Sequence, residues 1–500
     1  MQALRTSDIT RKSYLFLAVL VFLTFGHTLN YSFVWDDNKV LDDPVLEDFP
    51  ITKIPSLFTK PLWASLGVTE YEQVFYRPLS AAFGVMQYKL WRQNPWGYRL
   101  VSIMLHLLCA IVVYKVCLLM SCQRASALFG ASLFAVHPVN VESVVWISAA
   151  SSFTGIFVIL SVYAFMKDRL FPSLAMFALG LLSKEVVIML PAAMLVFSVH
   201  RDGVKKGTVK LLPFFMAAVV YLGVRALILG HNTFGGGMVQ PMQDRIPSML
   251  VAMADYMRLL VFPFYLRPFY PAAWYASLTD PRVMVSALLL IAAAAFVYFR
   301  FRRDRDLLFL SCMLFVFLIP PVWFVNVLAG GGDESAYIAE RYLYMSTMSL
   351  SIMAALYASR MGNAARKIVM SSLIVLFMAL AVLQSTIWKD GITFFTRIAR
   401  DNPASLFAHS GLGGAYLKEG RFDEAREHLL FVIGKNPFST NAINAHISLG
   451  NVYLEQRQFD RAISEYRYVL SIRKDDRRAL HNLQAAYALA GEKGAAAGSE

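Results

Sequence analysis

Residues Tyr14–Val34, YLFLAVLVFLTFGHTLNYSFV, form an apolar run that is followed at once by Trp35-Asp36-Asp37-Asn38. An apolar run of about 20 residues is long enough to cross the hydrocarbon core of a bilayer as a helix. The run is too long for the core of a signal peptide, and no small-residue cleavage site follows it, so we expect a retained membrane helix. The acid pair Asp36 and Asp37 then lies where membrane meets water.

The composition predicts an all-α membrane protein with many spans. The chain has 500 residues, of which 57% are hydrophobic and only 16% charged, whereas soluble proteins carry about 25% charged residues. The net charge of +13 falls largely in short loops between apolar runs, as the positive-inside rule predicts, so we do not expect nucleic-acid binding. The four cysteines show neither zinc-ligand spacing nor a disulfide framework.

Basic residues in the loops set the orientation of the spans. Arg5, Arg11 and Lys12 precede the first run, so the N-terminus is expected to be cytoplasmic. Segments 35–95 and 248–275 are expected on the outer face, the first as a loop of interfacial helices and the second as an outer or re-entrant segment. About eleven spans are predicted, at 14–34, 96–120, 125–147, 151–166, 170–182, 186–199, 211–229, 283–299, 307–328, 342–358 and 368–387.

The C-terminal part repeats itself, so the chain is divided into a membrane domain, 1–387, and a repeat domain, 388–500. The spacing between repeats is first 37 and then 34 residues, and 34 is the period of tetratricopeptide repeats. We expect a short α-solenoid on the outer face that binds an acceptor polypeptide or a partner protein, with the three extra residues in a linker between helices. The recurring residues are Leu412-Gly413, Tyr416 and Ala425, then Leu449-Gly450, Tyr453 and Ala462, then Leu483 and Tyr487.

The predicted topology places the unusual polar residues near membrane depth on the outer face, where ionisable side chains are functional candidates. Transfer of a sugar from a polyprenyl phosphate would use such a set. Cations hold the phosphate and its developing charge, and a carboxylate takes the proton of the acceptor hydroxyl. Two neighbouring carboxylates could instead hold a divalent metal. These polar residues are Asp36, Asp37, Arg77, His137, Glu142, Lys184, Glu185, Glu340 and Arg341.

Structural roles are the alternative for individual members of this set. His137 could be a hydrogen-bonded interfacial histidine. Glu142 could cap a helix or pair with Lys184. Glu340 and Arg341 could form a local ion pair.

Several motifs together resemble the GT-C-type membrane glycosyltransferases, and among them the transmembrane and tetratricopeptide repeat-containing O-mannosyltransferases and their bacterial relatives. The motifs are Phe33-Val34-Trp35-Asp36-Asp37, Tyr76-Arg77-Pro78-Leu79, Asn94-Pro95-Trp96-Gly97-Tyr98-Arg99-Leu100, Phe134-Ala135-Val136-His137-Pro138-Val139, Leu182-Ser183-Lys184-Glu185, and Ala339-Glu340-Arg341-Tyr342-Leu343-Tyr344. The chain departs from the pattern at Asn140, where a second histidine is expected. It departs again at Ala149-Ala150-Ser151-Ser152, where relatives often have a Gly-Arg or Gly-Lys pair and an acid.

The resemblance implies transfer of a sugar, mannose in relatives, from a polyprenyl phosphate to Ser or Thr, with inversion at the anomeric carbon. It implies that Asp36 and Asp37 are the catalytic acid pair. It leaves the cofactor unknown, and a divalent metal ion held by Asp36 and Asp37 stays open. The residues that it implies for the donor phosphate and the pocket are Arg77, His137, Glu142, Lys184, Glu185 and Arg341.

Two other functions remain open from the residues. One is an envelope oligosaccharide ligase or polymerase, which would rely on Arg and His in a large outer loop late in the chain. The other is a non-catalytic membrane scaffold, which would not need acids at Asp36 and Asp37. The short repeat array favours a bacterial inner-membrane protein with periplasmic repeats. In a eukaryote the endoplasmic reticulum membrane is expected.

Overall fold

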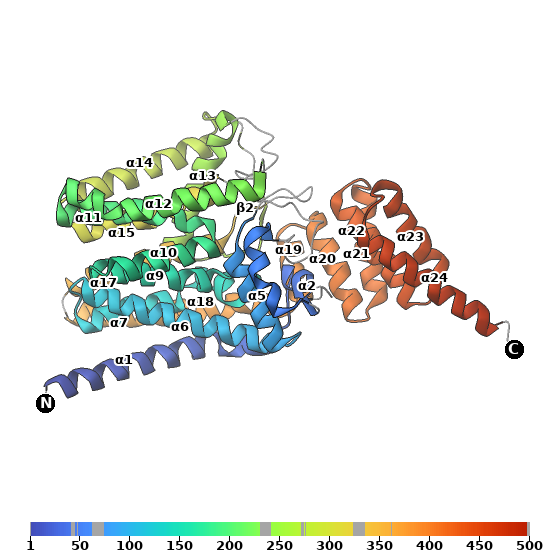
Figure 1. Ribbon diagram of the computed structural model, residues 1–500, viewed down its shortest axis with the longest axis horizontal. Coiled ribbons are helices and arrows are strands. Elements are labelled where there is room, and N and C mark those ends of the chain that lie inside the picture. Colours follow the sequence, from blue (N-terminus) through green and yellow to red (C-terminus); the bar gives the residue numbers. More distant parts are fainter. Residues whose placement is uncertain are drawn as a thin grey trace. The chain divides into compact units, whose positions relative to one another are not determined.

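The computed structural model describes residues 2–41, 46–47, 49–62, 75–230, 242–271, 275, 277–323, 336–361 and 363–497. These residues are predominantly helical, as predicted, and their single β-pairing joins β1 (Tyr270–Pro271) to β2 (Ala336–Ile338). The chain forms two compact units, and the main boundary between them falls between Trp388 and Lys389 (Figure 1).

A helix overlaps each of the eleven predicted spans. Five helices are long and apolar enough to cross a membrane, or six if a bent pair counts as one span, so the number of crossings stays a prediction. Large apolar side chains such as Leu15, Leu227, Leu288 and Leu383 are exposed along these helices, which is typical of an integral membrane protein. The helices are α1 (Gln2–Phe25), α6 (Pro95–Leu119), α7 (Arg124–Val136), α9 (Ser151–Met166), α10 (Leu170–Ser183), α11 (Leu190–Asp202), α12 (Val204–Leu229), α14 (Pro281–Phe301), α15 (Arg305–Val316), α17 (Tyr344–Ser359) and α18 (Asn363–Ser385).

Two predicted spans are interrupted. The first α-helix ends at Phe25 and not at Val34, and a 3-10 turn and extended residues lead to the acid pair. The span predicted at 125–147 is broken after α7, where the chain bends by 48° before α8 (Val141–Val145). Pro138 lies at this bend. Proline has no backbone N–H and its ring clashes with the preceding turn, so a helix does not continue through it.

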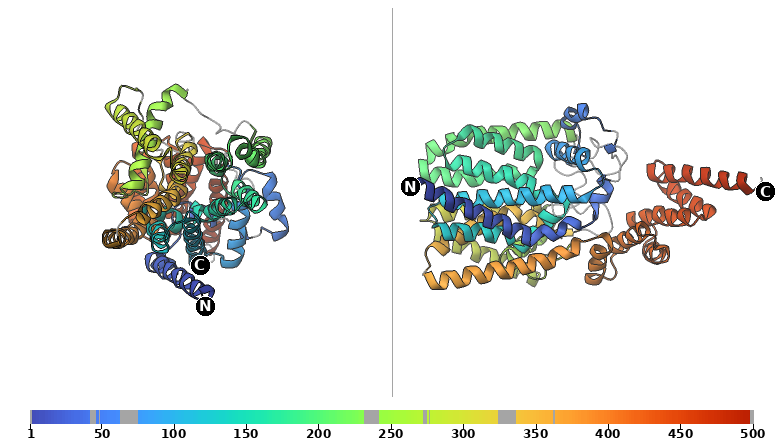
Figure 2. Two further views of the ribbon diagram at one scale, coloured as in Figure 1. Left: turned by 90° about the vertical axis from the view of Figure 1, so that its left-hand side faces the viewer. Right: turned by 90° about the horizontal axis from the view of Figure 1, so that it is seen from below.

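Helix α7 packs against α1, α6, α17 and α18, within a unit whose helices run side by side (Figure 2). A glycine permits the closest of these approaches. A Cβ on Gly130 would lie 2.7 Å from both the Ala355 Cβ and the Ser351 carbonyl oxygen, so any larger residue would push α7 from α17. This close packing fixes the position of the bend and of α8 beyond it.

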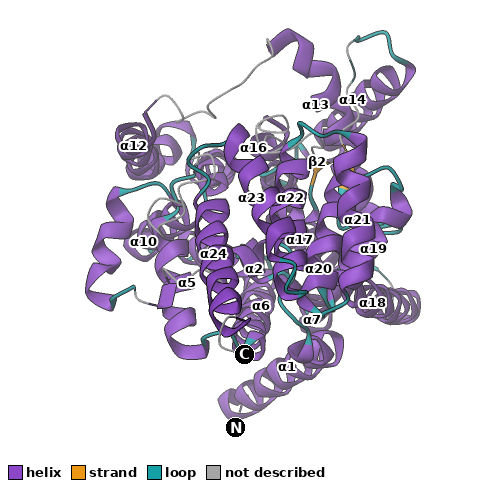
Figure 3. Cartoon of the chain, turned by 90° about the vertical axis from the view of Figure 1, so that its right-hand side faces the viewer, coloured by secondary structure: helices purple, strands orange, loops and turns teal. Residues whose placement is uncertain are grey.

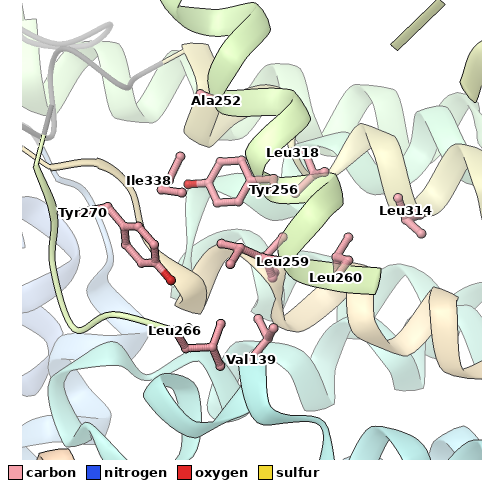
Figure 4. Packing of buried hydrophobic residues seen from close by; sticks show 11 residues of the cluster. Val139, Ala252, Tyr256, Leu259, Leu260, Leu266, Tyr270, Leu314, Leu318 and Ile338 are labelled. Carbon is pink, nitrogen blue, oxygen red and sulfur yellow. The ribbon is translucent and has the colours of Figure 1, made fainter. Parts of the chain in front are cut away.

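Helix α13 (Met242–Val261) overlaps the segment predicted at 248–275 on the outer face, and it packs against the residues beyond the bend. Its side chains Tyr256, Leu259 and Leu260 are buried in one cluster with Val139 and Ile338 (Figure 4). The cluster joins segments that are far apart in sequence. It thereby holds the residues after β2 close to those that follow α7.

The first loop is built from short helices, and its apolar side chains form a small core of their own. Phe33, Leu57, Val85 and Tyr98 belong to this buried cluster. It attaches the loop to the start of α6. The described helices of the loop are α2 (Asp36–Leu41), η2 (Ile51–Thr59) and α5 (Pro78–Trp91).

The second unit consists of antiparallel helices that pack in sequence order (Figure 3). The recurring glycines lie where the two helices of a pair meet. A Cβ on Gly413 would lie 2.4 Å from Leu429, and one on Gly450 would lie 2.5 Å from Tyr466. The spacing therefore reflects a repeated close approach between helices. The helices are α19 (Gly391–Asp401), α20 (Leu406–Lys418), α21 (Phe422–Lys435), α22 (Thr440–Glu455), α23 (Phe459–Ile472) and α24 (Arg477–Ala497).

The prediction that three extra residues lie in a linker is wrong. The connections 436–439 and 473–476 have equal length, whereas α22 has 16 residues and α20 has 13. The extra residues extend the N-terminal end of α22. Three residues are close to one helical turn of 3.6, so Leu449 and Gly450 keep the same face as their counterparts in α20.

Candidate active site

The acid pair begins α2, and its two members differ in environment. Asp37 is fully buried, whereas Asp36 is partly exposed. The Asp37 Oδ1 accepts hydrogen bonds from the Ser148 backbone N–H at 2.9 Å and the Ser148 hydroxyl at 2.6 Å, and its Oδ2 accepts from Val34 N–H at 3.4 Å. Asp37 therefore fastens the first loop to the segment after α8.

Burial raises the pKa of Asp37 from 3.8 to about 6, although the Ser148 hydrogen bonds and the charge of Arg99 oppose the rise. An acid whose pKa is higher in the folded state binds more protons folded than unfolded. The stability that this proton contributes is fully present below pH 3.8 and is lost as the pH rises through about 6.

The unfolding temperature is therefore expected to fall as the pH is raised from about 4 to about 6, through the raised pKa of Asp37. Asp37→Asn, which keeps an acceptor for Ser148, should flatten this part of the profile because it has no proton to lose. Thermal unfolding of the detergent-purified protein at a series of pH values measures both curves. An unchanged slope in Asp37→Asn would show that another group causes the pH dependence.

The residue before the acid pair, Trp35, has a backbone φ of 55°. A left-handed conformation costs a residue with a side chain about 1–2 kcal/mol, and a bulky residue there is an outlier. The indole of Trp35 stacks on that of Trp146 with ring centres 4.7 Å apart and planes 7° apart. Trp146 in turn stacks on Trp388 at 5.8 Å.

Arg99 is a site residue that the sequence analysis did not single out. It is buried, and its guanidinium donates to the carbonyl oxygens of Tyr31 at 3.1 Å, Val145 at 2.5 Å and Ser32. It therefore ties the chain before the acid pair to the end of α8, and its charge acts on Asp37. A charge inside an apolar helix was the signal that could have identified it. No such signal marks Ser148.

Glu142 and Arg341 form an ion pair that joins α8 to the turn before α17. The Glu142 carboxylate accepts from the Arg341 backbone N–H at 2.7 Å and from its Nη1 at 2.5 Å. Only 4% of the glutamate side chain and 19% of the arginine side chain are exposed. The Arg341 guanidinium also lies 5.0 Å from the centre of the Trp146 ring. This is the ring on which Trp35 stacks.

Arg77 and Glu185 form a second pair, in which Nε donates to Oε2 at 2.8 Å and Nη2 donates to Oε1 at 2.5 Å. Lys184 is buried next to it, with its Nζ 3.4 Å from the Ser151 hydroxyl and 5.2 Å from the centre of the Tyr342 ring. Burial, and then the charges of Arg77 and Arg341, lower the pKa of Lys184 to about 7. Both arginines and both glutamates act on Lys184, so the structure brings these five predicted residues together.

Glu340 is buried beside this cluster. Its Oε1 accepts from the Tyr270 hydroxyl at 2.7 Å and from the Arg267 N–H at 3.0 Å. Burial and the neighbouring charge of Glu142 raise the pKa of Glu340 well above its usual range. Glu340 therefore does not form the local pair with Arg341 that was one of the alternatives, since Arg341 pairs with Glu142.

His137 is not among these contacts. It is fully buried, its Nε2 lies 3.1 Å from the Leu260 carbonyl oxygen, and its Nδ1 accepts from Val139 N–H at 3.4 Å. Phe377 lies edge-on to its ring. Both ring nitrogens are thus engaged within the protein, which fits the interfacial alternative. A role of His137 in substrate binding stays a prediction.

Among the described residues, no group of three or more His, Cys, Asp or Glu side chains is placed to hold a metal ion. The Asp37 Oδ1 is already occupied by two donors from Ser148. A metal held by Asp36 and Asp37 stays a prediction that these contacts do not favour.

Comparison with known proteins gives limited similarity. No family model matches the chain. Protein O-mannosyl-transferase TMTC3 of Mus musculus is 24% identical over 167 residues, which is 33% of this chain and 18% of the length of that relative. The resemblance expected from the sequence is thereby confirmed, but over a third of the chain.

The solved structure of ArnT from Cupriavidus metallidurans bound to undecaprenyl phosphate aligns with a TM-score of 0.43 and 14% sequence identity. The alignment covers 89% of this chain and 78% of that one. The chain is thus an integral membrane protein similar in part to an O-mannosyltransferase.

Proposed function

We propose that the protein is a membrane glycosyltransferase that moves one sugar from a polyprenyl phosphate to a protein Ser or Thr hydroxyl, with inversion. Mannose is the proposed sugar, by resemblance. The observation that carries the proposal is the joining of the acid pair to a buried cluster of cations and carboxylates. Trp35 and Asp37 attach to residues 146–148, and Arg341 lies on the same Trp146 ring.

The cluster has the charge that a phosphate needs. Arg77, Lys184 and Arg341 provide three cationic groups, and Glu142 and Glu185 provide two carboxylates. With Lys184 protonated, the set has one excess positive charge. Since its pKa is lowered to about 7, the single negative charge of an arriving donor phosphodiester would draw a proton onto Lys184 and strengthen binding. The same charge would stabilise the phosphate as it departs.

Asp36 is the proposed general base. Of the two acids it is the more exposed, so it can come within hydrogen-bonding reach of an acceptor hydroxyl. Asp37 has its carboxylate fixed by Ser148 and Val34 and would hold α2 in place. The division of roles follows from burial and contacts and not from the order of the two residues.

The second unit is proposed to hold the acceptor polypeptide or a partner protein. A cavity of about 560 Å³ lies at the ends of α20, α22 and α24, lined by residues that include Lys418, Asn451, Glu455 and Asn482. Lining by both charges and by amides suits a polypeptide with polar side chains. We propose that this unit lies on the outer face, which is the periplasmic face in a bacterium.

The decisive experiment uses the full-length protein in liposomes. Polyprenyl-phosphate mannose, the glucose analogue and a lipid-pyrophosphate oligosaccharide are offered in parallel with Ser/Thr-containing peptides, and products are identified by mass spectrometry and NMR. We expect transfer of one sugar, with an inverted anomeric configuration, from a monophosphate donor. Use of the oligosaccharide alone would indicate a ligase. Absence of transfer from every donor would contradict the proposal and favour a scaffold.

A further inference from the structure

The two residues that flank Asp36 are both anchored to one short segment. On one side, Trp35 stacks on Trp146 at 4.7 Å. On the other, Asp37 accepts two hydrogen bonds from Ser148. Asp36 lies between these anchors at the first position of α2, so its backbone is held on both sides.

The backbone at this point does not need a tryptophan. With a φ of 55°, the position would suit glycine, which adopts positive φ without steric cost. A bulky residue keeps such a conformation only where the surrounding structure holds it there. What the tryptophan adds over glycine is its ring and the stack on Trp146.

The partner of that stack also contacts the cation cluster. The guanidinium of Arg341 lies 5.0 Å from the centre of the Trp146 ring. Glu142 holds Arg341 in this position, because its carboxylate accepts hydrogen bonds from both the backbone N–H and the Nη1 of Arg341. A continuous set of contacts therefore runs from Asp36 through Trp35 and Trp146 to Arg341.

We propose that Trp35 is a positioning residue whose stack on Trp146 fixes the Asp36 carboxylate relative to the Arg341 guanidinium. The inference rests on the proposed function, in which Asp36 takes the proton of the acceptor and Arg341 binds the donor phosphate. Trp35 itself need not touch either substrate. Its ring sets the distance between the proposed base, Asp36, and the proposed phosphate-binding group, Arg341. In-line transfer requires this distance to be held within narrow limits.

The test is Trp35→Gly in the full-length protein in liposomes. Glycine keeps the turn and removes the ring, so the unfolding temperature should be unchanged or higher. The kcat for transfer should fall by about tenfold to a hundredfold while the KM for the donor changes little, as expected when only alignment is lost. The near-ultraviolet circular dichroism of the stacked indole pair should also disappear. A purely structural role would not separate kcat from KM in a folded protein.

The matched control is Arg92→Gly. Arg92 has a φ of 51° at the C-terminal end of α5, so it tests the same backbone change away from the acid pair, and its kcat should match the wild type. If Trp35→Gly does not fold, Trp35→Asn and Trp35→Phe replace it. Asparagine tolerates positive φ without offering a ring, so its kcat should be lower than that of the phenylalanine variant.

The outcomes separate the two proposals. A wild-type protein that transfers no sugar would overturn the proposed function, and the positioning role with it. An active wild type with an equally active Trp35→Gly would overturn the positioning role alone. Equal kcat values for folded asparagine and phenylalanine variants would overturn it as well.

Discussion

Asp36→Asn is expected to lower the rate of sugar transfer by about 10²–10⁴-fold, the usual contribution of a general base. The amide has nearly the same shape as the carboxylate but cannot take the proton of the acceptor hydroxyl at neutral pH. Asp36 is partly exposed at the start of α2, so the substitution should leave folding intact. Single-turnover transfer from a polyprenyl-phosphate sugar measures the effect directly.

Asp37→Asn is the matched control for this prediction. Its oxygen can still accept from Ser148, which holds the first loop in place, so we expect a smaller loss of rate. The reverse order, with transfer abolished in Asp37→Asn and retained in Asp36→Asn, would exchange the roles of the two acids. Wild-type rates in both variants would show that neither is the base.

The sequence predicted the helices well because their signal is local. A run of about 20 apolar residues predicts a membrane helix from its own composition, and a helix overlaps each predicted span. The exceptions have local causes that carry less weight in a hydropathy pattern. Pro138 breaks the span predicted at 125–147, and three residues placed in a linker instead lengthen α22 by nearly one turn.

The pairing of the charges could not be predicted in the same way. The structural alternatives for Glu142 were a helix cap or a pair with Lys184, yet it pairs with Arg341, 199 positions away in sequence. Glu185 pairs with Arg77 across 108 positions. Which partner a charge finds depends on how the helices pack, and Gly130 shows that a single absent side chain sets one such approach. Polarity at membrane depth therefore predicts the members of the site but not its contacts.

Arg99 and Ser148 illustrate the two ways in which a site residue is missed. Arg99 is the fifth residue of α6 and donates to three carbonyl groups of neighbouring segments. A charged residue in an apolar helix is a signal that could have identified it. Ser148 provides both donors for Asp37, but serine is too common for its type to indicate this. Only the fold places it there.

Glu142→Gln is expected to lower the unfolding free energy by about 3–5 kcal/mol, as found when one partner of a buried ion pair is removed. The glutamate side chain is 4% exposed and the arginine 19%, so little water is available to solvate the guanidinium that remains. Glutamine retains one acceptor oxygen, but it cannot serve both the Arg341 backbone N–H and its Nη1 as a carboxylate does. Unfolding in a detergent titration measures the change.

Asp304→Asn is the control for this effect, because Asp304 pairs with Arg360 where the arginine is 49% exposed. Asparagine can still cap α15 as Asp304 does by accepting from Leu307 N–H, so only the ion pair is lost. An exposed pair contributes about 0–1 kcal/mol, and the control should change stability by no more than that. The double variant Glu142→Gln/Arg341→Gln should recover part of the loss, since it leaves no uncompensated buried charge.

Equal small losses in Glu142→Gln and Asp304→Asn would mean that water reaches the Glu142–Arg341 pair. The cluster would then be an open, solvated site, and the stronger electrostatics that a buried pocket offers a donor phosphate would be lost.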